Sequence, residues 1–446
     1  MTSNSYFPFG SVAVLVDPIN GSDSYGRRFG PPFATLGGAR SAAGAGDTIF
    51  VLPGTYNETN LAKHLVHWFF LPGAKVTYTG SSYSSLFDDS ALGTAADLIC
   101  TVGGYGEFTH SGGSGAGAAE FGCFLVTRAG SAVTVKCQSC RVTKDDTNTF
   151  AVTLLLGALS IECESISAAI SGGAVAWKGG TFHVTAKTIS TDAGGLGAYT
   201  IWGSDPGVVS EMFVTANLIS NPIYAAIALA GVSADFKLWV NAKEIVGKLG
   251  GVTSASIHVT GGKLYVSGLQ KLSSIATCGL YMTGGEVWIE AQKFTCDLTS
   301  SAVANGFPQH IKITGGTLYA DVKHFETVGA VNVGNGCELN GGLSYIRGQQ
   351  MKILNGAGIT TAGGFHDVFG MRIDTSTTNT ATNYPVLLTA YSLVLRNCWL
   401  VCPGAVVSIF AASAKSVQCF GSAATNAVHA NVTQVVQGVT VNGAVG

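Results

Sequence analysis

A short phrase that recurs along the middle of the chain most constrains its fold. In each clear copy, Thr-Gly-Gly precedes a run of alternating residues, at positions 260–266, 283–289 and 314–320. Gly-Gly pairs favour turns, and alternation with a period of two favours a β-strand. Looser copies keep the strand, and the residue just before each strand aligns at Gly157, Gly180, Ser210, Phe236, Gly262, Gly285, Gly316 and Gly342. The steps between these positions are 23, 30, 26, 26, 23, 31 and 26 residues.

A strand-rich repeat of this length is typical of a solenoid, in which each unit stacks on the one before. Leucine-rich repeats have similar periods, but their Leu-x-x-Leu-x-Leu-x-x-Asn phrase is absent. The pattern therefore predicts an all-β fold, a single-stranded right-handed parallel β-helix. Loops of variable length would absorb the difference between 23 and 31 residues.

The surface of such a solenoid must be largely uncharged. Charged residues make up 11% of the 446 residues, and 60 residues are glycine, whereas ordinary soluble domains are about 25% charged. A net charge of −2 gives no electrostatic case for nucleic acid as the main partner. No apolar run reaches the ~18 residues that a membrane helix needs. We expect neither nucleic-acid binding nor membrane insertion.

The cysteines and the start of the chain indicate a reducing compartment. Eleven cysteines are an odd number, and Cys137 and Cys163 fall at small inward strand positions, where cysteine acts as a compact apolar residue. The first residues lack the basic and apolar regions of a secretory signal. We expect free core thiols and synthesis in a cytoplasm. The nine histidines are dispersed, so we expect no metal and no cofactor.

The N-terminal segment carries a family resemblance. Residues 11–17 form a strand-like run, followed by the turn 20–23, Pro32-Phe33-Ala34-Thr35-Leu36, a short helix ending near Ala43, and the segment 46–56 with Pro53-Gly54-Thr55-Tyr56. This string resembles the first turn of pectin-lyase-like right-handed β-helix proteins, and the continuation through residues 68–74 is similar to viral tail-spike and fibre proteins. The resemblance implies that the helix caps the open end of the solenoid. It says little about activity, because the fold hosts lyases, hydrolases, adhesins and inert fibres.

Composition divides the chain into four predicted segments. Residues 1–80 would form an arm and the capped start of the β-helix, and residues 81–123 Gly/Ser-rich irregular turns or a hinge. Residues 124–400 would form the shaft, and residues 401–446 a small β-rich oligomerisation tail. No Asp, Glu, Lys or Arg follows Lys415, so an isolated tail would be an aggregation-prone edge. Pairing with two sister tails would cover that edge, which favours a homotrimer.

Alternation assigns the faces of the repeated strand. The inward columns hold Leu238, Val240 and Ala242, then Leu264, Val266 and Gly268, then Val287, Ile289 and Ala291. The outward face carries an aromatic ladder of His183, Phe213, Trp239, Tyr265, Trp288 and Tyr319. Beside it run the polar column Thr185, Thr215, Asn241, Ser267, Glu290 and Asp321 and a further column of Lys187, Asn217, Lys243, Leu269, Gln292 and Lys323. Two interpretations stay open for the ladder: contact with a neighbouring subunit or another layer of the chain, or a strip on which sugar rings stack.

Catalytic chemistry has only weak sequence support. Hydrolysis of a polysaccharide needs two carboxylates about 5–10 Å apart. Glu162 and Glu164 share a strand face, as do Glu286 and Glu290 on the strand of Trp288. These four are tentative catalytic residues. A lyase would need a cluster of acidic residues beside an Arg or Lys base, and the sequence has no such cluster.

The sequence therefore leads us to expect a viral, bacteriophage-type structural fibre or spike on the virion surface. It would be a homotrimer that contacts other virion proteins through its N-terminal region and binds a host surface glycan or receptor. One alternative is a glycan-cleaving spike, a polysaccharide hydrolase or lyase. Another is a non-viral surface adhesin, which the missing signal disfavours.

Overall fold

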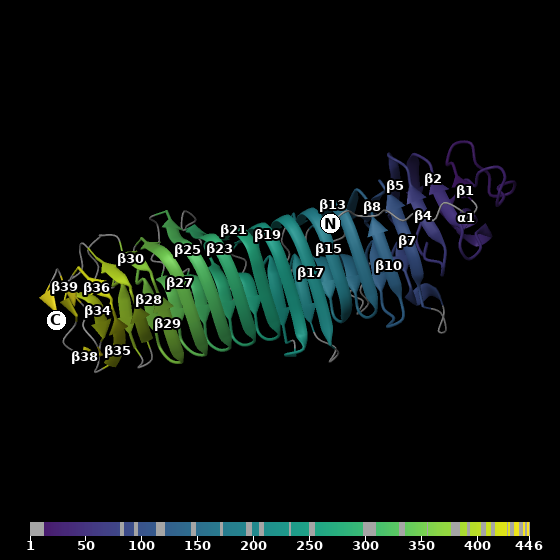
Figure 1. Ribbon diagram of the computed structural model, residues 1–446. Coiled ribbons are helices and arrows are strands. Elements are labelled where there is room, and N and C mark those ends of the chain that lie inside the picture. The colour runs from purple at the N-terminus through teal and green to yellow at the C-terminus, as the bar shows by residue number, and fades with distance from the viewer. Residues whose placement is uncertain are drawn as a thin grey trace. The chain divides into compact units, whose positions relative to one another are not determined.

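The computed structural model describes two compact units, residues 1–187 and 188–446. The described residues are 13–80, 84–92, 97–112, 121–143, 149–169, 173–192, 199–204, 209–231, 233–248, 255–297, 309–329, 335–354, 356–375, 384–389, 393–402, 407–411, 415–425, 427–428, 432–436, 440–441 and 444–445. The N-terminal arm, most of the glycine-rich run at 111–117 and the Thr/Asn-rich loop after Thr375 lie outside these ranges. Each unit is a parallel β-solenoid, with its strands stacked as successive turns (Figure 1).

The first unit has two parallel sheets and one α-helix. Its larger sheet holds β1 (Ala13–Val16), β2 (Thr48–Val51), β3 (Gly54–Asn57), β4 (His67–Phe70), β5 (Ala74–Tyr78), β7 (Ile99–Gly104), β8 (Glu107–His110), β10 (Ala132–Lys136), β11 (Ser139–Val142) and β13 (Ala158–Ala168). Its second sheet holds β6 (Phe87–Asp88), β9 (Phe124–Val126), β12 (Phe150–Leu154) and β14 (Gly173–Trp177). Helix α1 spans Leu36–Ala42, and a 3-10 turn, η1, spans Ser90–Leu92. Strand β15 (Gly180–Thr191) carries the chain into the second unit.

The second unit repeats the pattern, with larger-sheet strands of 11–13 residues from Ser210 to Ile353, shorter strands after them, and a last strand that is antiparallel to its neighbour. Its larger sheet holds β17 (Ser210–Asn221), β19 (Phe236–Lys248), β21 (Lys263–Ile275), β23 (Glu286–Asp297), β25 (Thr317–Val328), β27 (Leu343–Ile353), β29 (Phe365–Phe369), β30 (Arg372–Thr375), β32 (Leu393–Arg396), β33 (Trp399–Val401), β35 (Lys415–Phe420), β36 (Ala423–Ala424), β38 (Val432–Val436), β39 (Thr440–Val441) and β40 (Ala444–Val445). Its second sheet holds β16 (Ile201–Ser204), β18 (Ile227–Ala230), β20 (Ala255–Val259), β22 (Cys278–Met282), β24 (Gln309–Ile313), β26 (Asn335–Leu339), β28 (Ile359–Thr361), β31 (Val386–Leu388), β34 (Val407–Ala411) and β37 (Ala427–Val428).

The Gly-Gly phrase is a turn that only glycine allows. Gly285 has a φ of +75°, and a Cβ there would lie 2.7 Å from the carbonyl carbon of Gly261 in the turn before. The next residue, Glu286, donates its N–H to the carbonyl oxygen of Gly262 at 2.9 Å. The glycines at equivalent positions of the neighbouring turns also have positive φ. Glycine therefore sets the register by letting successive turns approach closely at this corner.

The predicted register of the long strands is confirmed in the second unit. Ser210 pairs with Phe236, Lys237 with Lys263 and Lys263 with Glu286, so the strands stack without offset. The steps of 26 and 23 residues seen in the sequence therefore each correspond to one turn. Within each long strand, two consecutive residues point outward, as Lys243 and Glu244 do in β19. Because alternation breaks there, the strand turns a corner and contributes two sides to its turn.

The core follows the predicted inward columns, with one correction. Leu238, Val240, Val287 and Ile289 are at most 1% exposed. In β21 the alternation shifts by one residue, and Leu269 instead of Gly268 pairs with Ala291. Leu269 is 2% exposed, whereas Gly268 bulges outward with a φ of +68°. The assignments of Gly268 as inward and Leu269 as outward were wrong, because a β-bulge inserts one extra residue into the strand.

The first unit has a more aromatic interior than the narrow core that the repeats suggested. Trp68 and Phe70 are fully buried, with ring centroids 6.0 Å apart. The rings of Phe87 and Phe124 stack at 5.1 Å, and Phe108 contacts both edge-on. These rings therefore pack against one another in the interior of the first turns.

Helix α1 lies where the sequence predicted it and is capped at both ends. The Glu58 carboxylate accepts hydrogen bonds from the N–H groups of Leu36 and Gly37 at 2.7 and 2.6 Å. The Lys63 ammonium donates to the carbonyl oxygens of Arg40 and Ala43 at 2.7 and 2.6 Å. A negative group at the N-terminus and a positive group at the C-terminus both favour the helix dipole. The apolar side of α1, including Leu36, is buried against the first strands.

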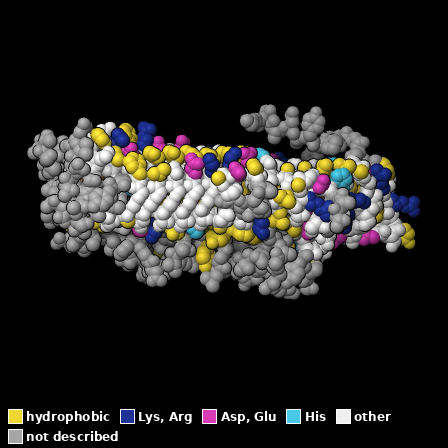
Figure 2. Space-filling model, turned by 90° about the horizontal axis from the view of Figure 1, so that it is seen from below, with side chains coloured by type: hydrophobic (Ala, Val, Ile, Leu, Met, Phe, Trp, Pro, Cys, Tyr) yellow, Lys and Arg dark blue, Asp and Glu magenta, His cyan; other side chains and the backbone are white. Residues whose placement is uncertain are grey.

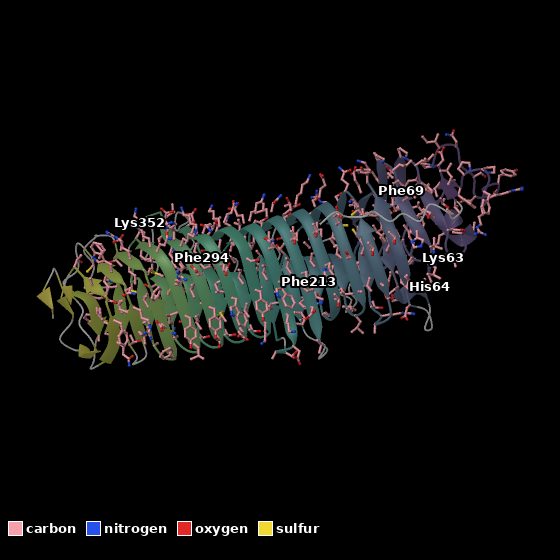
Figure 3. The ribbon with its side chains drawn as sticks, viewed as in Figure 1. Lys63, His64, Phe69, Phe213, Phe294 and Lys352 are labelled. Atoms are coloured by element: carbon pink, nitrogen blue, oxygen red, sulfur yellow. The ribbon has the colours of Figure 1, made fainter. Side chains whose placement is uncertain are left out.

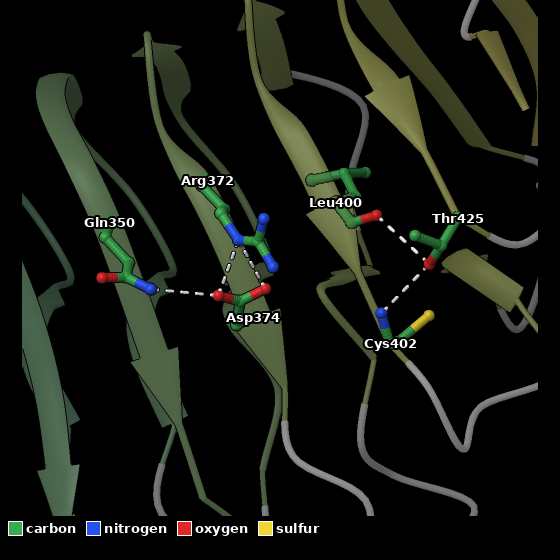
Figure 4. A network of polar contacts seen from close by, with 6 residues as sticks. All are labelled: Gln350, Arg372, Asp374, Leu400, Cys402 and Thr425. Atoms are coloured by element: carbon green, nitrogen blue, oxygen red, sulfur yellow. Dashed lines mark hydrogen bonds and ion pairs between the residues drawn. The ribbon is translucent and has the colours of Figure 1, made fainter. Parts of the chain in front are cut away.

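Polar side chains link successive turns near the C-terminus. Figure 4 shows Asp374 accepting hydrogen bonds from Arg372 and from Gln350, which lies on the turn before, the latter at 3.1 Å. Thr425 accepts from the N–H of Cys402 at 3.2 Å and donates to the carbonyl of Leu400. The described strands β38 and β39 also pair with β35 and β36, so part of the predicted tail continues the solenoid.

Candidate functional site

The outward aromatic side chains of the second unit form a continuous stack. The ring centroids of neighbouring turns are 4.7 Å apart for Phe213–Trp239, 5.3 Å for Trp239–Tyr265, 4.6 Å for Tyr265–Trp288, 5.2 Å for Trp288–Tyr319 and 5.1 Å for Tyr319–Tyr345. The angles between ring planes are only 6–11°. Phe213, where this stack begins in the unit, is labelled in Figure 3. His183, the remaining predicted member, lies in the first unit on β15.

This geometry determines which parts of the rings reach solvent. A ring inside the stack has a neighbour against each face, so only its outer edge is exposed. Sugars bind aromatic side chains through the ring faces, where C–H groups meet the π electrons, and those faces are already occupied between Trp239 and Tyr319. The stack therefore joins turns together, and its exposed side is a row of ring edges with tyrosine hydroxyl and indole N–H groups.

The ladder is longer than the sequence predicted and ends in an exposed apolar strip. Tyr345 continues the stack, and Phe365 follows with a centroid distance of 6.4 Å and a tilt of 53°. We define the apolar strip by its members, which are all 38–43% exposed: Tyr319, Leu343, Tyr345, Phe365 and Phe369. The signal for Tyr345 was present, because it lies three residues after Gly342 as Tyr319 lies three after Gly316.

A groove lies beside the ladder at the β-bulge of Gly268. Its volume is about 620 Å³, and its lining is Gly268, Leu269, Gln270, Glu290, Ala291, Gln292, Asp321 and Lys323. We call it the bulge groove. Glu290 and Asp321 are paired in register on neighbouring turns, so both carboxylates project from the same column. Bulges often lie next to binding sites, because they redirect side chains locally.

Most of the tentative catalytic carboxylates form ion pairs with lysines. Glu162 lies 2.9 Å from the Lys136 ammonium and Glu164 lies 2.5 Å from that of Lys187. Glu286 lies 3.1 Å from Lys263, one turn away.

Glu290 differs, since it has no ion pair with any residue that the structure describes. Its neighbour Asp321 is 4.0 Å from Arg347. Alternation had placed these carboxylates on outward faces, but only the stacking of turns shows which cation meets each.

Other potential chemical groups are structural. Ser344 contacts Nδ1 of His366 at 2.9 Å, but both residues are 0% exposed, so no substrate reaches this Ser–His pair. In the described ranges, no group of His, Cys, Asp and Glu side chains is arranged to hold a metal ion. The same part of the chain has no helix of the length and hydropathy that crossing a membrane requires.

Figure 2 shows one face of the molecule, on which parallel rows of backbone and uncharged polar side chains, coloured white, carry few charged groups. No protein-family model matches the chain, and no match was found among curated proteins or solved structures. The function is therefore inferred from the residues alone.

Proposed function

We propose that this protein is a structural fibre or spike of a virus, of bacteriophage type, that acts in host attachment. In this proposal it stands on the virion surface as a homotrimer, contacts other virion proteins through its N-terminal region and binds a host surface glycan. The observation that carries the proposal is one side of the second unit, where the apolar strip on β25, β27 and β29 adjoins the polar bulge groove on β21, β23 and β25.

The apolar strip supports the assembly part of the proposal. Five large apolar side chains, each 38–43% exposed, lie on three successive turns, where Tyr345 stacks on Tyr319 and Leu343 pairs in register with Phe365. Soluble monomers rarely expose large contiguous apolar patches, and such patches mark interaction sites. Every copy of the chain carries the same strip, so a trimer with rotational symmetry would bury the strip of each of its three subunits.

The bulge groove supports the glycan part. Gln270 and Gln292 offer amide donors and acceptors, Glu290 and Asp321 offer acceptors, and Lys323 offers three donors. A sugar presents many hydroxyl groups that both donate and accept, so a mixed polar lining of this kind suits it. Because the ladder faces are covered, we place sugar recognition in this groove and not on the rings.

Light scattering on the purified 446-residue chain tests assembly. We expect a mass near three times 45.7 kDa. Leu343→Glu places a charge in the apolar strip and should yield monomers, since an unpaired charge is costly to bury. Val209→Glu is the matched control, because Val209 is also exposed, at 69%, but lies outside the strip, and it should leave the mass unchanged. A monomeric wild-type protein would refute the assembly proposal.

Binding to an array of bacterial surface polysaccharides tests glycan recognition. We expect retention on at least one polysaccharide. The double variant Gln270→Ala, Lys323→Ala should weaken retention at least about tenfold, since each of the two lost hydrogen bonds is worth about 1 kcal/mol. Lys248→Ala removes an exposed lysine at the end of β19 and is the control. Equal loss in the control, or no retention at all, would contradict the groove assignment.

A second function, glycan cleavage, rests on one observation. Glu290 and Asp321 are paired on turns about 4.8 Å apart, which is close to the separation that retaining glycosidases use, about 5–5.5 Å. If the groove hydrolyses its glycan, wild-type protein should release reducing ends and Glu290→Gln should abolish release while binding persists. Binding without release in the wild type would leave attachment as the function.

A further inference from the structure

Four thiols of the first unit gather in one place. Cys123, Cys137, Cys140 and Cys163 are all free and at most 8% exposed, and the Sγ atoms of Cys137 and Cys140 are 3.5 Å apart. Cys163 lies close enough to Cys137 and Cys140 for their thiols to affect its pKa. Cys137 and Cys140 have a Cys-x-x-Cys spacing. Their positions in the sequence do not show that Cys163 joins them.

Cys137 and Cys163 face each other on successive turns. Lys136 pairs with Glu162 in the parallel register of β10 and β13, and the N–H of Cys137 donates to the carbonyl of Glu162 at 3.0 Å. The next pair in register is therefore Cys137 and Cys163. Neighbouring strands lie about 4.8 Å apart, within the range of about 4.4–6.8 Å between Cα atoms that a disulfide spans. The backbone already holds these two residues at a bonding separation.

A groove gives small molecules access to this pair. It has a volume of about 370 Å³, and its lining includes Tyr105, Gln138 and both cysteines. The ion pairs Lys136–Glu162 and Lys187–Glu164 flank the two thiols. Cys140 and Cys123 are not part of the groove lining and are 0% exposed.

The two thiols differ in acidity. Hydrogen bonds from Cys137 and Cys140 lower the pKa of the Cys163 thiol, against the effect of its burial and of the Glu162 and Glu164 charges. Although Cys140 acts to lower it, Cys163 and burial raise the pKa of the Cys137 thiol well above its usual range. The thiolate is the reactive form of cysteine, so Cys163, which lines the groove and has the lowered pKa, is the nucleophile of the pair.

We propose that Cys163 and Cys137 form an oxidation site for hydrogen peroxide and small organic hydroperoxides, and that its product is a disulfide between successive turns. The Cys163 thiolate attacks one peroxide oxygen, an S–O bond forms and the O–O bond breaks. Hydroxide, or the alkoxide of an organic hydroperoxide, leaves and takes a proton from solvent, so the peroxide is reduced by two electrons and Cys163 becomes a sulfenic acid. The Cys137 sulfur then attacks the Cys163 sulfur, the S–S bond forms, the S–O bond breaks, and the hydroxide leaves as water with the Cys137 proton.

Peptide mapping after oxidation tests the site. The intact chain is treated with one equivalent of hydrogen peroxide per monomer, quenched and alkylated. It is then digested with trypsin, which places Cys137 and Cys140 in one peptide ending at Arg141 and Cys163 in another ending at Lys178. We expect these two peptides to be joined by a disulfide. A loss of two hydrogens within the short peptide alone would show a Cys137–Cys140 bond and overturn the proposal.

Two variants and an internal control complete the test. Cys137→Ser should stop the disulfide and leave a sulfenic acid on Cys163 that dimedone traps. Cys163→Ser should remove both products. Cys337, buried at 0% exposure in the second unit, reports the reactivity of an ordinary core thiol. We expect Cys163 to react at least about tenfold faster, because its thiolate is stabilised, and equal rates would overturn the proposal.

Discussion

Trp288 provides the sharpest test of the idea that the ladder holds turns together. Its ring stacks on Tyr265 at 4.6 Å and on Tyr319 at 5.2 Å, with interplanar angles of 9° and 11°. Each aromatic pair contributes about 0.5–1.5 kcal/mol beyond area burial, so Trp288→Ala loses about 2 kcal/mol from the two stacks. The substitution also removes about 100 Å² of buried apolar surface, which costs about a further 2.5 kcal/mol. We expect a total loss of about 4.5 kcal/mol in the local free energy of unfolding.

Native-state hydrogen exchange is the appropriate measurement, because solenoids open turn by turn and a global unfolding curve averages over the turns. Protection should fall in β23 and in its neighbours β21 and β25, and the strands of the first unit should keep theirs. A double-mutant cycle with Tyr265→Ala isolates the stack, and its coupling energy should be about 1 kcal/mol. A coupling of zero would refute the claim that stacking contributes to stability.

The same variant separates the two interpretations of the ladder. If Trp288→Ala remains folded and trimeric and keeps its glycan retention, the ring serves the fold alone. Dissociation of a folded trimer would instead make the ladder part of the interface. Selective loss of glycan retention would contradict the argument that the ring faces are covered.

Three further substitutions test other parts of the fold. Gly285→Ala should lower the free energy of unfolding by about 2 kcal/mol or more, because its Cβ would lie 2.7 Å from the carbonyl carbon of Gly261. Gly231 also has a positive φ but has open space around it, so Gly231→Ala should cost only the ~1 kcal/mol of the backbone conformation, and thermal unfolding measures both. Glu58→Ala removes the acceptor for two N–H groups of α1 and should lower stability by about 1–2 kcal/mol, seen as faster exchange in the first helical turn. Burial lowers the pKa of His310 to about 4 from 6.5, so the neutral ring contributes fully to the free energy of unfolding above pH 6.5, and this contribution falls by up to about 3 kcal/mol as the pH drops to 4. His310→Leu should flatten that part of the pH profile of stability, measured by urea unfolding.

The fold could be predicted because glycine and alternation carry independent information. Gly262, Gly285 and Gly316 must adopt positive φ at the corner of each turn, so their spacing gives the register directly. Strand alternation then places the side chains that follow on one face or the other. The bulge at Gly268 escaped prediction because a strand with one extra residue still alternates on both sides of it. Only the pairing with β23 shows that Leu269 lies inside.

The candidate sites depend on contacts between turns, which sequence positions do not fix. Lys136 meets Glu162 and Lys263 meets Glu286 because the loops between them have particular lengths. The tentative carboxylates therefore looked equivalent in sequence, and stacking separates Glu290 from the other three. The orientation of the ladder rings was also beyond prediction, since alternation gives the side of the strand and not the plane of the ring.

Stacking in register also explains how one strand can hold structural and binding groups without conflict. Along β23, Val287 and Ile289 face the core, Trp288 joins the neighbouring rings, and Glu290 lines the groove two residues later. Each role belongs to one column of side chains that runs across the turns, so a substitution in one column leaves the contacts within the next column unchanged. Substitutions at Gln270 or Lys323 should therefore weaken the proposed glycan binding with little effect on stability. Substitutions at Trp288 should do the reverse, and a variant that changed both together would show that the columns are coupled through the bulge at Gly268.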